Sequence, residues 1–169
     1  MPDETTLPRK RLIMYAIAFA FSLSSALPAY IGSSFLKKVF ETIGHIDNTE
    51  SLISIVYTAS SILAIAAFIE MPSLIRRFGN FRITIGLLLL EILSFAGIIV
   101  PNTSNTMAIV SAFILNFVSI SLINFTLDIF LESFSSNNKT GKIRGAFLTI
   151  SSSAWLISPI LGSHILGNE

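Results

Sequence analysis

The sequence predicts an all-α fold: a polytopic membrane helical bundle with five transmembrane helices. Hydrophobic residues make up 52% of the 169 residues and charged residues only 12%, about half the charged share of an average soluble domain. The apolar residues also fall into five long runs that are nearly free of charge. A bilayer core requires roughly 20 apolar residues in a helix, so these runs favour membrane spans and disfavour a soluble enzyme.

The five runs cover residues 12–36, 52–69, 83–100, 107–127 and 145–166. Only the third contains a charged residue, Glu91. Inside a bilayer each backbone polar group must be satisfied within its own segment, so helices are expected, and the runs lack the alternation of barrel strands. Pro72, Pro101 and the Ser-Ser-Asn-Asn segment at 135–138 predict turns in short connections. Residues 1–169 are therefore expected to form a single membrane domain.

Lys and Arg residues predict the orientation. The N-terminal arm and the second and fourth connections hold nine of the 11 basic residues, and the first connection holds Lys37 and Lys38. Because cytoplasmic segments are enriched in Lys and Arg, the N-terminus is expected in the cytoplasm and the protein in the plasma membrane. A secretory signal cleaved after Ala26 is the alternative for the first run. Apolar residues continue past that point, which favours a full span.

Several kinds of chemistry are absent from the sequence. The chain has no cysteine and two histidines, so it offers no disulfide and no histidine or cysteine metal site of its own. It contains no phosphate-binding glycine loop, nucleophile elbow or paired acids of a soluble cleft. The net charge of +1 gives no general attraction to nucleic acid. We therefore expect no enzyme activity, no catalytic residue, no cofactor and no nucleic-acid partner.

Three segments occur in an informative order. The second connection reads Pro72-Ser-Leu-Ile-Arg-Arg-Phe-Gly-Asn-Phe-Arg82, the fourth ends in Lys-Thr-Gly-Lys-Ile-Arg-Gly, and the fifth run contains Ser158-Pro-Ile-Leu-Gly-Ser163. Together they resemble the first five helices of a major facilitator superfamily (MFS) transporter. That family has G-x-L-A-D-R-F-G-R-R in the second connection, a basic loop before the fifth helix, and in some members G-P-x-x-G-G within it. The residues that fit the first signature are Leu74, Arg77, Phe78, Gly79 and Arg82, whereas Pro72 and Arg76 replace its glycine and aspartate.

The resemblance implies a secondary active transporter that moves a small solute by alternating access between two six-helix halves. Its expected partners are the lipid bilayer, an unknown small solute, H⁺ or Na⁺ as a coupling ion, and the missing second half of the transporter. The chain is accordingly expected to be a fragment, truncated after the fifth helix. The alternative is a small non-transporting integral membrane protein that acts as a structural or assembly subunit. A membrane-embedded enzyme is disfavoured by the lack of His, Asp and Glu clusters.

Polar residues form a narrow stripe on each of two predicted helices. On the first helix the stripe covers about 80° of arc and on the fourth about 120°. The resemblance implies that these two helices line a central cavity, so the stripes are candidates for contact with a hydrophilic solute. Interhelical hydrogen bonds, worth about 0.6 kcal/mol each, are the equal alternative. The candidates are Tyr15, Ser22 and Ser25, and then Asn116 and Asn124, with Asp128 at the end of the second stripe.

Glu91 lies near the middle of the third run. A charge at that depth costs about 3 kcal/mol on insertion scales, so a carboxyl group there is a candidate for proton coupling. The alternative is a structural carboxyl packed against a neighbouring helix. The resemblance favours the structural role, because the third helix of the family is usually peripheral to the cavity.

Charged residues predict an ion-pair cluster on the cytoplasmic side. Asp128 and Glu132 lie four residues apart, hence on one helix face. The nearest basic residues on that side are Arg76, Arg77 and Arg82. We expect Arg77, with Arg76 as a second candidate, to pair with Asp128 or Glu132. The alternative is that the arginines only fix topology or meet anionic lipid.

Small residues predict close packing along the fifth helix. They recur on one narrow face, where small side chains let two helix backbones approach. Pro28 and Pro159 each remove one helix hydrogen bond, and both predict kinks. The expected packing residues are Ser151, Ala154, Ser158, Pro159 and Gly162.

Overall fold

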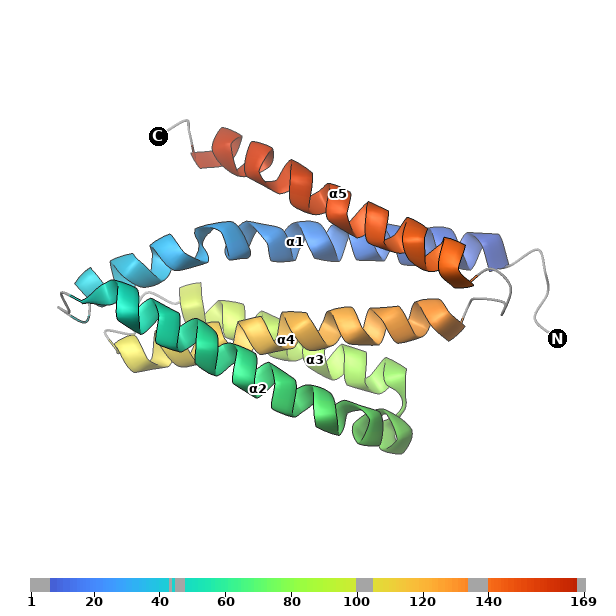
Figure 1. The fold of residues 1–169 in the computed structure, drawn as a ribbon, viewed down its shortest axis with the longest axis horizontal. Helices are drawn as coiled ribbons and strands as arrows, with labels where there is room; N and C mark the ends of the chain where they lie inside the picture. Colours follow the sequence, from blue (N-terminus) through green and yellow to red (C-terminus); the bar gives the residue numbers. More distant parts are fainter. Residues whose placement is uncertain (1–6, 43, 45–47, 100–104, 134–139, 167–169) are drawn as a thin grey trace. The chain divides into compact units, whose positions relative to one another are not determined.

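The computed structural model is helical throughout nearly all of the chain that it describes, which confirms the predicted all-α fold (Figure 1). It describes the backbone of residues 7–42, 44, 48–99, 105–133 and 140–166, and the side chains there except those of 7–11, 140 and 162–166. The predicted turns at Pro101 and 135–138 lie outside the described residues. The helices are α1 (Leu7–Thr42), α2 (Thr49–Phe78), α3 (Asn80–Ile99), α4 (Thr106–Ser133) and α5 (Thr140–Leu166).

Four helices are long and apolar enough to cross a bilayer, so the chain is a helical membrane protein. They are α2, α3, α4 and the Leu12–Thr42 part of α1. The fifth span stays a prediction, because the side chains at the end of α5 lie outside the described residues over which the candidate spans were found. Helices α1, α2 and α4 extend beyond their apolar runs, since backbone hydrogen bonding continues into the polar residues that flank a span.

The prediction of a turn at Pro72 is wrong. Pro72 lies inside α2, which continues to Phe78, and Gly79 is the only residue between α2 and α3. A helix can pass through a proline at the loss of one hydrogen bond. The turn falls instead at Gly79, whose φ of 83° is the left-handed conformation that glycine adopts most readily.

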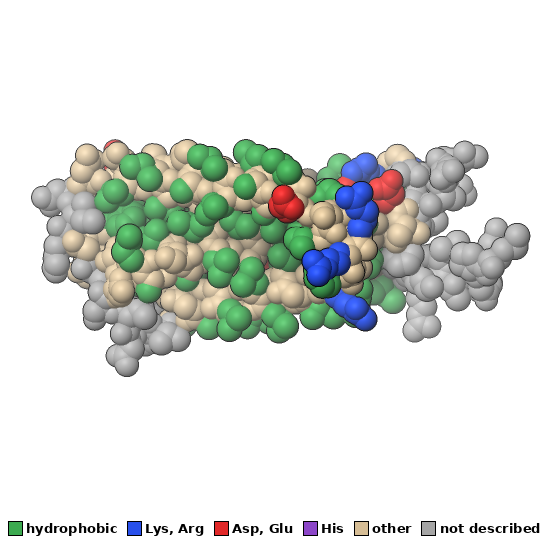
Figure 2. All heavy atoms as spheres, turned by 90° about the horizontal axis from the view of Figure 1, so that it is seen from below, with side chains coloured by type: hydrophobic (Ala, Val, Ile, Leu, Met, Phe, Trp, Pro, Cys, Tyr) green, Lys and Arg blue, Asp and Glu red, His purple; other side chains and the backbone are tan. Residues whose placement is uncertain are grey.

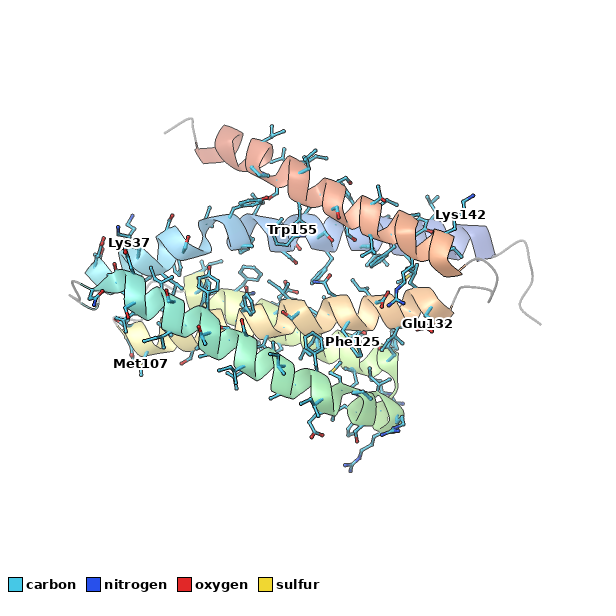
Figure 3. All side chains as sticks on the ribbon, viewed as in Figure 1. Lys37, Met107, Phe125, Glu132, Lys142 and Trp155 are labelled. Carbon is cyan, nitrogen blue, oxygen red and sulfur yellow. The ribbon has the colours of Figure 1, made fainter. Side chains whose placement is uncertain are left out.

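The chain divides into two compact units. Unit 2 covers Gly32–Thr126 and contains the end of α1, all of α2 and α3, and most of α4. Its core includes the buried Leu36, Phe40, Val56 and Phe113. Tyr57 of α2 meets the ring of Phe113 edge-on, with 5.6 Å between ring centroids. Farther along the same two helices, Phe68 makes a similar edge contact with Phe125 (Figure 3).

Unit 1 covers Met1–Ile31 and Leu127–Glu169, and contains the first part of α1, the end of α4, and α5. Within it, small side chains are fully or almost fully buried on α1 at Ala18 and Ala26 and on α5 at Ala154. The ring of Trp155 on α5 lies 6.0 Å from the ring of Tyr30 on α1, centroid to centroid (Figure 3). Small and aromatic residues therefore provide the contacts between α1 and α5.

Candidate functional site

Helix α3 has its polar side chains on the inside and its apolar side chains on the outside. Its buried residues are Thr84, Glu91 and Ser94, all polar. None of its large apolar side chains is buried, and Leu89, Ile92 and Leu93 are among the exposed ones. A soluble protein has the opposite arrangement, whereas polar residues in membrane helices face the bundle interior. The polar face of α3 is therefore the strongest candidate for a functional site in unit 2.

This polar face packs closely against α4. The side-chain amide of Asn116 donates a hydrogen bond to the Ser94 hydroxyl over 3.2 Å, and both residues are buried. One turn along α3, a Cβ atom added at Gly97 would lie only 3.2 Å from the Ala112 Cβ. At the other end of α3, the side-chain amide of Asn80 donates to the Thr126 carbonyl over 3.0 Å. These contacts hold α3 and α4 side by side along the length of α3.

The Glu91 carboxyl group lies in this interface, and the residue is only 7% exposed. The nearby polar side chains bond elsewhere: the Ser94 hydroxyl donates to the Glu91 backbone carbonyl over 2.7 Å, and the Asn116 amide donates one of its two N–H groups to Ser94. Within the part of the chain that the structure describes, no hydrogen bond or ion pair reaches the Glu91 carboxyl. The site can thus hold a carboxyl group, but its described side chains supply no counter-charge.

The predicted cavity residues have different surroundings. On α1, Ser22 and Ser25 are buried, and the Ser25 hydroxyl donates to the Phe21 carbonyl over 2.8 Å. Tyr15 is partly buried and its hydroxyl donates to the Ile143 carbonyl over 3.4 Å, within unit 1. On α4, Asn116 is buried against α3, whereas Asn124 is exposed and donates to the Ile120 carbonyl one turn earlier. Contact of these residues with a solute stays a prediction.

The sequence did not identify Arg144 as the partner of Asp128. In unit 1, the Arg144 Nε atom donates to one carboxylate oxygen of Asp128 over 3.0 Å, and the Nη2 atom pairs with the other oxygen. The hydrogen bonds and charge of Asp128 raise the pKa of the Arg144 guanidinium. The two residues flank the same predicted connection, which is the signal that could have found the pair. The predicted pairing of Arg76 or Arg77 with Asp128 or Glu132 joins the two units and stays a prediction.

Tyr30 is a second residue that the sequence analysis did not identify. Because Pro159 has no N–H, the Trp155 carbonyl one turn earlier lacks its helical donor. The Tyr30 hydroxyl donates to that carbonyl over 3.3 Å. The proline itself was the available signal, since a proline inside a helix always leaves one carbonyl unpaired.

The predicted packing face of α5 is partly described. Ala154 and Ser158 are fully buried and Ser151 is partly buried, whereas Pro159 is exposed. Among the described atoms, the Ser158 hydroxyl oxygen has no hydrogen-bond partner. The surroundings of Gly162 lie outside the described side chains. The burial of Ala154 and Ser158 agrees with close packing of small residues, and the packing role stays a prediction.

Comparisons with protein-family models, curated protein sequences and solved structures gave no match to this chain. The resemblance to the MFS therefore depends only on the residues quoted above. Three structural features bear on this resemblance: the helical membrane fold, the turn at Gly79 and the buried polar face of α3.

Proposed function

We propose that the chain is the membrane-embedded part of a secondary active transporter of the major facilitator type, which moves a small solute by alternating access. In this proposal a second set of helices completes the transporter, and a gradient of the solute, H⁺ or Na⁺ drives it. One observation carries the proposal: polar side chains are buried within apolar candidate spans, at Ser22 and Ser25 on α1 and at Asn116 on α4. Such residues commonly mark solute or ion pathways in membrane proteins.

Two further features support this function. Gly79 in its left-handed conformation provides the tight turn between α2 and α3 in the segment that resembles the family signature. Asn124 is exposed within a candidate span. An asparagine that faces lipid is unfavourable, so an aqueous cavity or further helices suit this position better.

The second candidate function is a non-transporting structural or assembly subunit. It is favoured by the internal hydrogen bonding of the predicted cavity residues, since Asn116 and Ser25 both donate within the chain. A protein whose polar groups serve only helix packing needs no aqueous pathway.

Cysteine accessibility separates the two functions, and the chain has no cysteine of its own to remove. We would introduce Tyr15→Cys and Asn124→Cys singly in the full-length protein in intact cells, because these two candidate cavity residues are partly buried and exposed, respectively. A membrane-impermeant methanethiosulfonate reagent would then be applied. The matched controls are Ile17→Cys and Leu115→Cys, which replace exposed apolar residues on the same two helices.

A transporter predicts reaction at positions 15 and 124 and none at the controls, because only residues beside an aqueous cavity form the reactive thiolate. If all four cysteines remain unmodified from both sides of the membrane, the transport proposal fails and the subunit is favoured.

The proposal includes a plasma-membrane location with the N-terminus in the cytoplasm, supported by the Lys and Arg distribution. Reporter fusions test the orientation. A reporter after residue 80 or 140 should be cytoplasmic, and one after residue 104 should be external. A cytoplasmic reporter at residue 104 would contradict the proposed topology.

A further inference from the structure

The corner between α2 and α3 carries a dense group of positive charges. Arg76 and Arg77 are in the last turn of α2, and Arg82 is in the first turn of α3. Because Gly79 alone joins the two helices, the three arginines are close along the chain at one turn. All three side chains are exposed. In Figure 2 the Lys and Arg side chains of the visible face lie toward one end, with Asp and Glu side chains beside them, and hydrophobic side chains are spread over the rest.

These arginines have no acidic partner among the described residues of unit 2, to which they belong. The ion pairs of the described residues are Lys37 with Glu41, in unit 2, and Arg144 with Asp128, in unit 1. The only acid in the segment from residue 70 to 82 is Glu70. It precedes Arg76 by six residues, whereas helix neighbours on one face are three or four residues apart. Asp128 already has both carboxylate oxygens engaged by Arg144.

The surroundings place this corner at the surface of the membrane. Helices α2 and α3 are both candidate spans, so the residues that connect them emerge where hydrocarbon gives way to headgroups. Phe78 and Phe81 beside the arginines are 44% and 67% exposed, and the Arg77 guanidinium lies over the Phe78 ring, 5.1 Å from its centroid. Exposed aromatic rings next to unpaired arginines suit the headgroup region, where rings contact acyl chains and guanidinium groups contact phosphate.

We propose that Arg76, Arg77 and Arg82 form a binding site for the phosphate of an anionic phospholipid. The partner is anionic in this proposal because the three positive charges meet no carboxylate among the described residues of unit 2. It must be a lipid because the site joins two membrane spans and includes exposed phenylalanines. The proposal is independent of transport, since it requires only that α2 and α3 span the membrane.

The test measures lipid binding to the purified full chain in a neutral detergent by native mass spectrometry. The probes are short-chain phosphatidylglycerol, short-chain phosphatidylcholine as the zwitterionic control, and glycerol 3-phosphate as the soluble phosphate. The test variant is Arg76→Gln/Arg77→Gln. The matched control is Lys37→Gln/Lys38→Gln, which removes the same charge at exposed positions where Lys37 already pairs with Glu41.

We expect the unmodified chain to prefer phosphatidylglycerol over phosphatidylcholine. A basic residue near a membrane surface contributes about fivefold to binding of anionic lipid, equivalent to about 1 kcal/mol. Arg76→Gln/Arg77→Gln should therefore weaken phosphatidylglycerol binding about 25-fold, while the lysine control leaves it unchanged. Arg76→Lys/Arg77→Lys should retain most of the preference, because charge is the main attraction.

Three results would overturn the proposal. The first is a phosphatidylglycerol preference that survives Arg76→Gln/Arg77→Gln, and the second is an equal loss in the lysine control. The third is competition by glycerol 3-phosphate at the concentration of the lipid, which would indicate a site for soluble phosphate. Circular dichroism checks that each variant is folded, and Arg82→Gln provides a second test if the double variant is not.

Discussion

Two helix contacts show different ways of holding helices together in a membrane. In unit 2, α3 and α4 approach closely at Gly97 and Ala112 and share a hydrogen bond between the side chains of Ser94 and Asn116. In unit 1, α1 and α5 meet through tyrosine hydroxyls that donate to backbone carbonyls. Those bonds measure 3.4 and 3.3 Å, at the long end of the hydrogen-bond range.

The comparison shows where each contact obtains its specificity. The α3–α4 contact depends on the small residue Gly97 and on the hydrogen-bonded pair of Ser94 and Asn116, so a substitution at any of these positions should lower the free energy of unfolding. The α1–α5 contact at Tyr30 depends on a carbonyl that Pro159 leaves without its helical donor. A change there should matter only while that proline is present.

The largest effect is expected from filling the close approach of α3 and α4. Gly97→Leu should lower the free energy of unfolding by about 1–3 kcal/mol, because even a Cβ atom at this position meets Ala112 at 3.2 Å. Gly86→Leu is the matched control on the same helix, since nothing lies within 4 Å of a Cβ atom there. Unfolding in mixed detergent micelles measures both. Equal losses in the two variants would show that the close approach to Ala112 does not decide the result.

The next effect tests the carbonyl beside Pro159. Tyr30→Phe should destabilise the protein by about 1 kcal/mol, because it leaves the Trp155 carbonyl without a donor in apolar surroundings. Tyr15→Phe should cost less, since the Ile143 carbonyl lies inside α5, where the helix supplies its own donor. In a Pro159→Ala background, Tyr30→Phe should have almost no effect. A loss that persists in that background would contradict this role of Tyr30.

Much of the fold could be predicted from hydropathy. Backbone N–H and C=O groups must be hydrogen-bonded within their own segment in lipid, so long apolar runs form helices. Pro72 was misinterpreted because a proline predicts a lost hydrogen bond, and a long helix can tolerate that loss within its length. The actual turn was marked in the sequence by Gly79, one residue after the last residue of α2.

The individual contacts of the site were less predictable. The cost of a charge in lipid is enough to expect that Glu91 is buried. The partner of Asn116 was not predictable, because helix periodicity gives the face of each helix but not the register between two helices. Arg144 was missed as the partner of Asp128 because the resemblance directed attention to the arginines of the second connection.

A smaller effect is expected from the hydrogen bond between the two helices of unit 2. Asn116→Ala should destabilise the protein by about 0.6 kcal/mol, the average for interhelical hydrogen bonds in a membrane. The double-mutant cycle with Ser94→Ala isolates the pair from the loss of side-chain volume. A coupling energy of zero in that cycle would leave close packing at Gly97 as the main source of stability in this contact.

The smallest effect is expected at Glu91, where the structural and proton-coupling roles predict different results. Glu91→Gln keeps the shape of the side chain and removes its charge, and no described group in the interface supplies a counter-charge. The free energy of unfolding should therefore change little, because swaps that conserve the volume of a packed side chain are tolerated best. Glu91→Ala should cost more, because it leaves a space between packed helices. Leu93→Ala is the control for a position that faces outward on the same helix.

If the carboxyl is structural, as we expect, gradient-driven uptake by the complete transporter should survive Glu91→Gln. Loss of uptake with intact solute exchange, in a variant of unchanged stability, would instead show that the proton on Glu91 is coupled to transport.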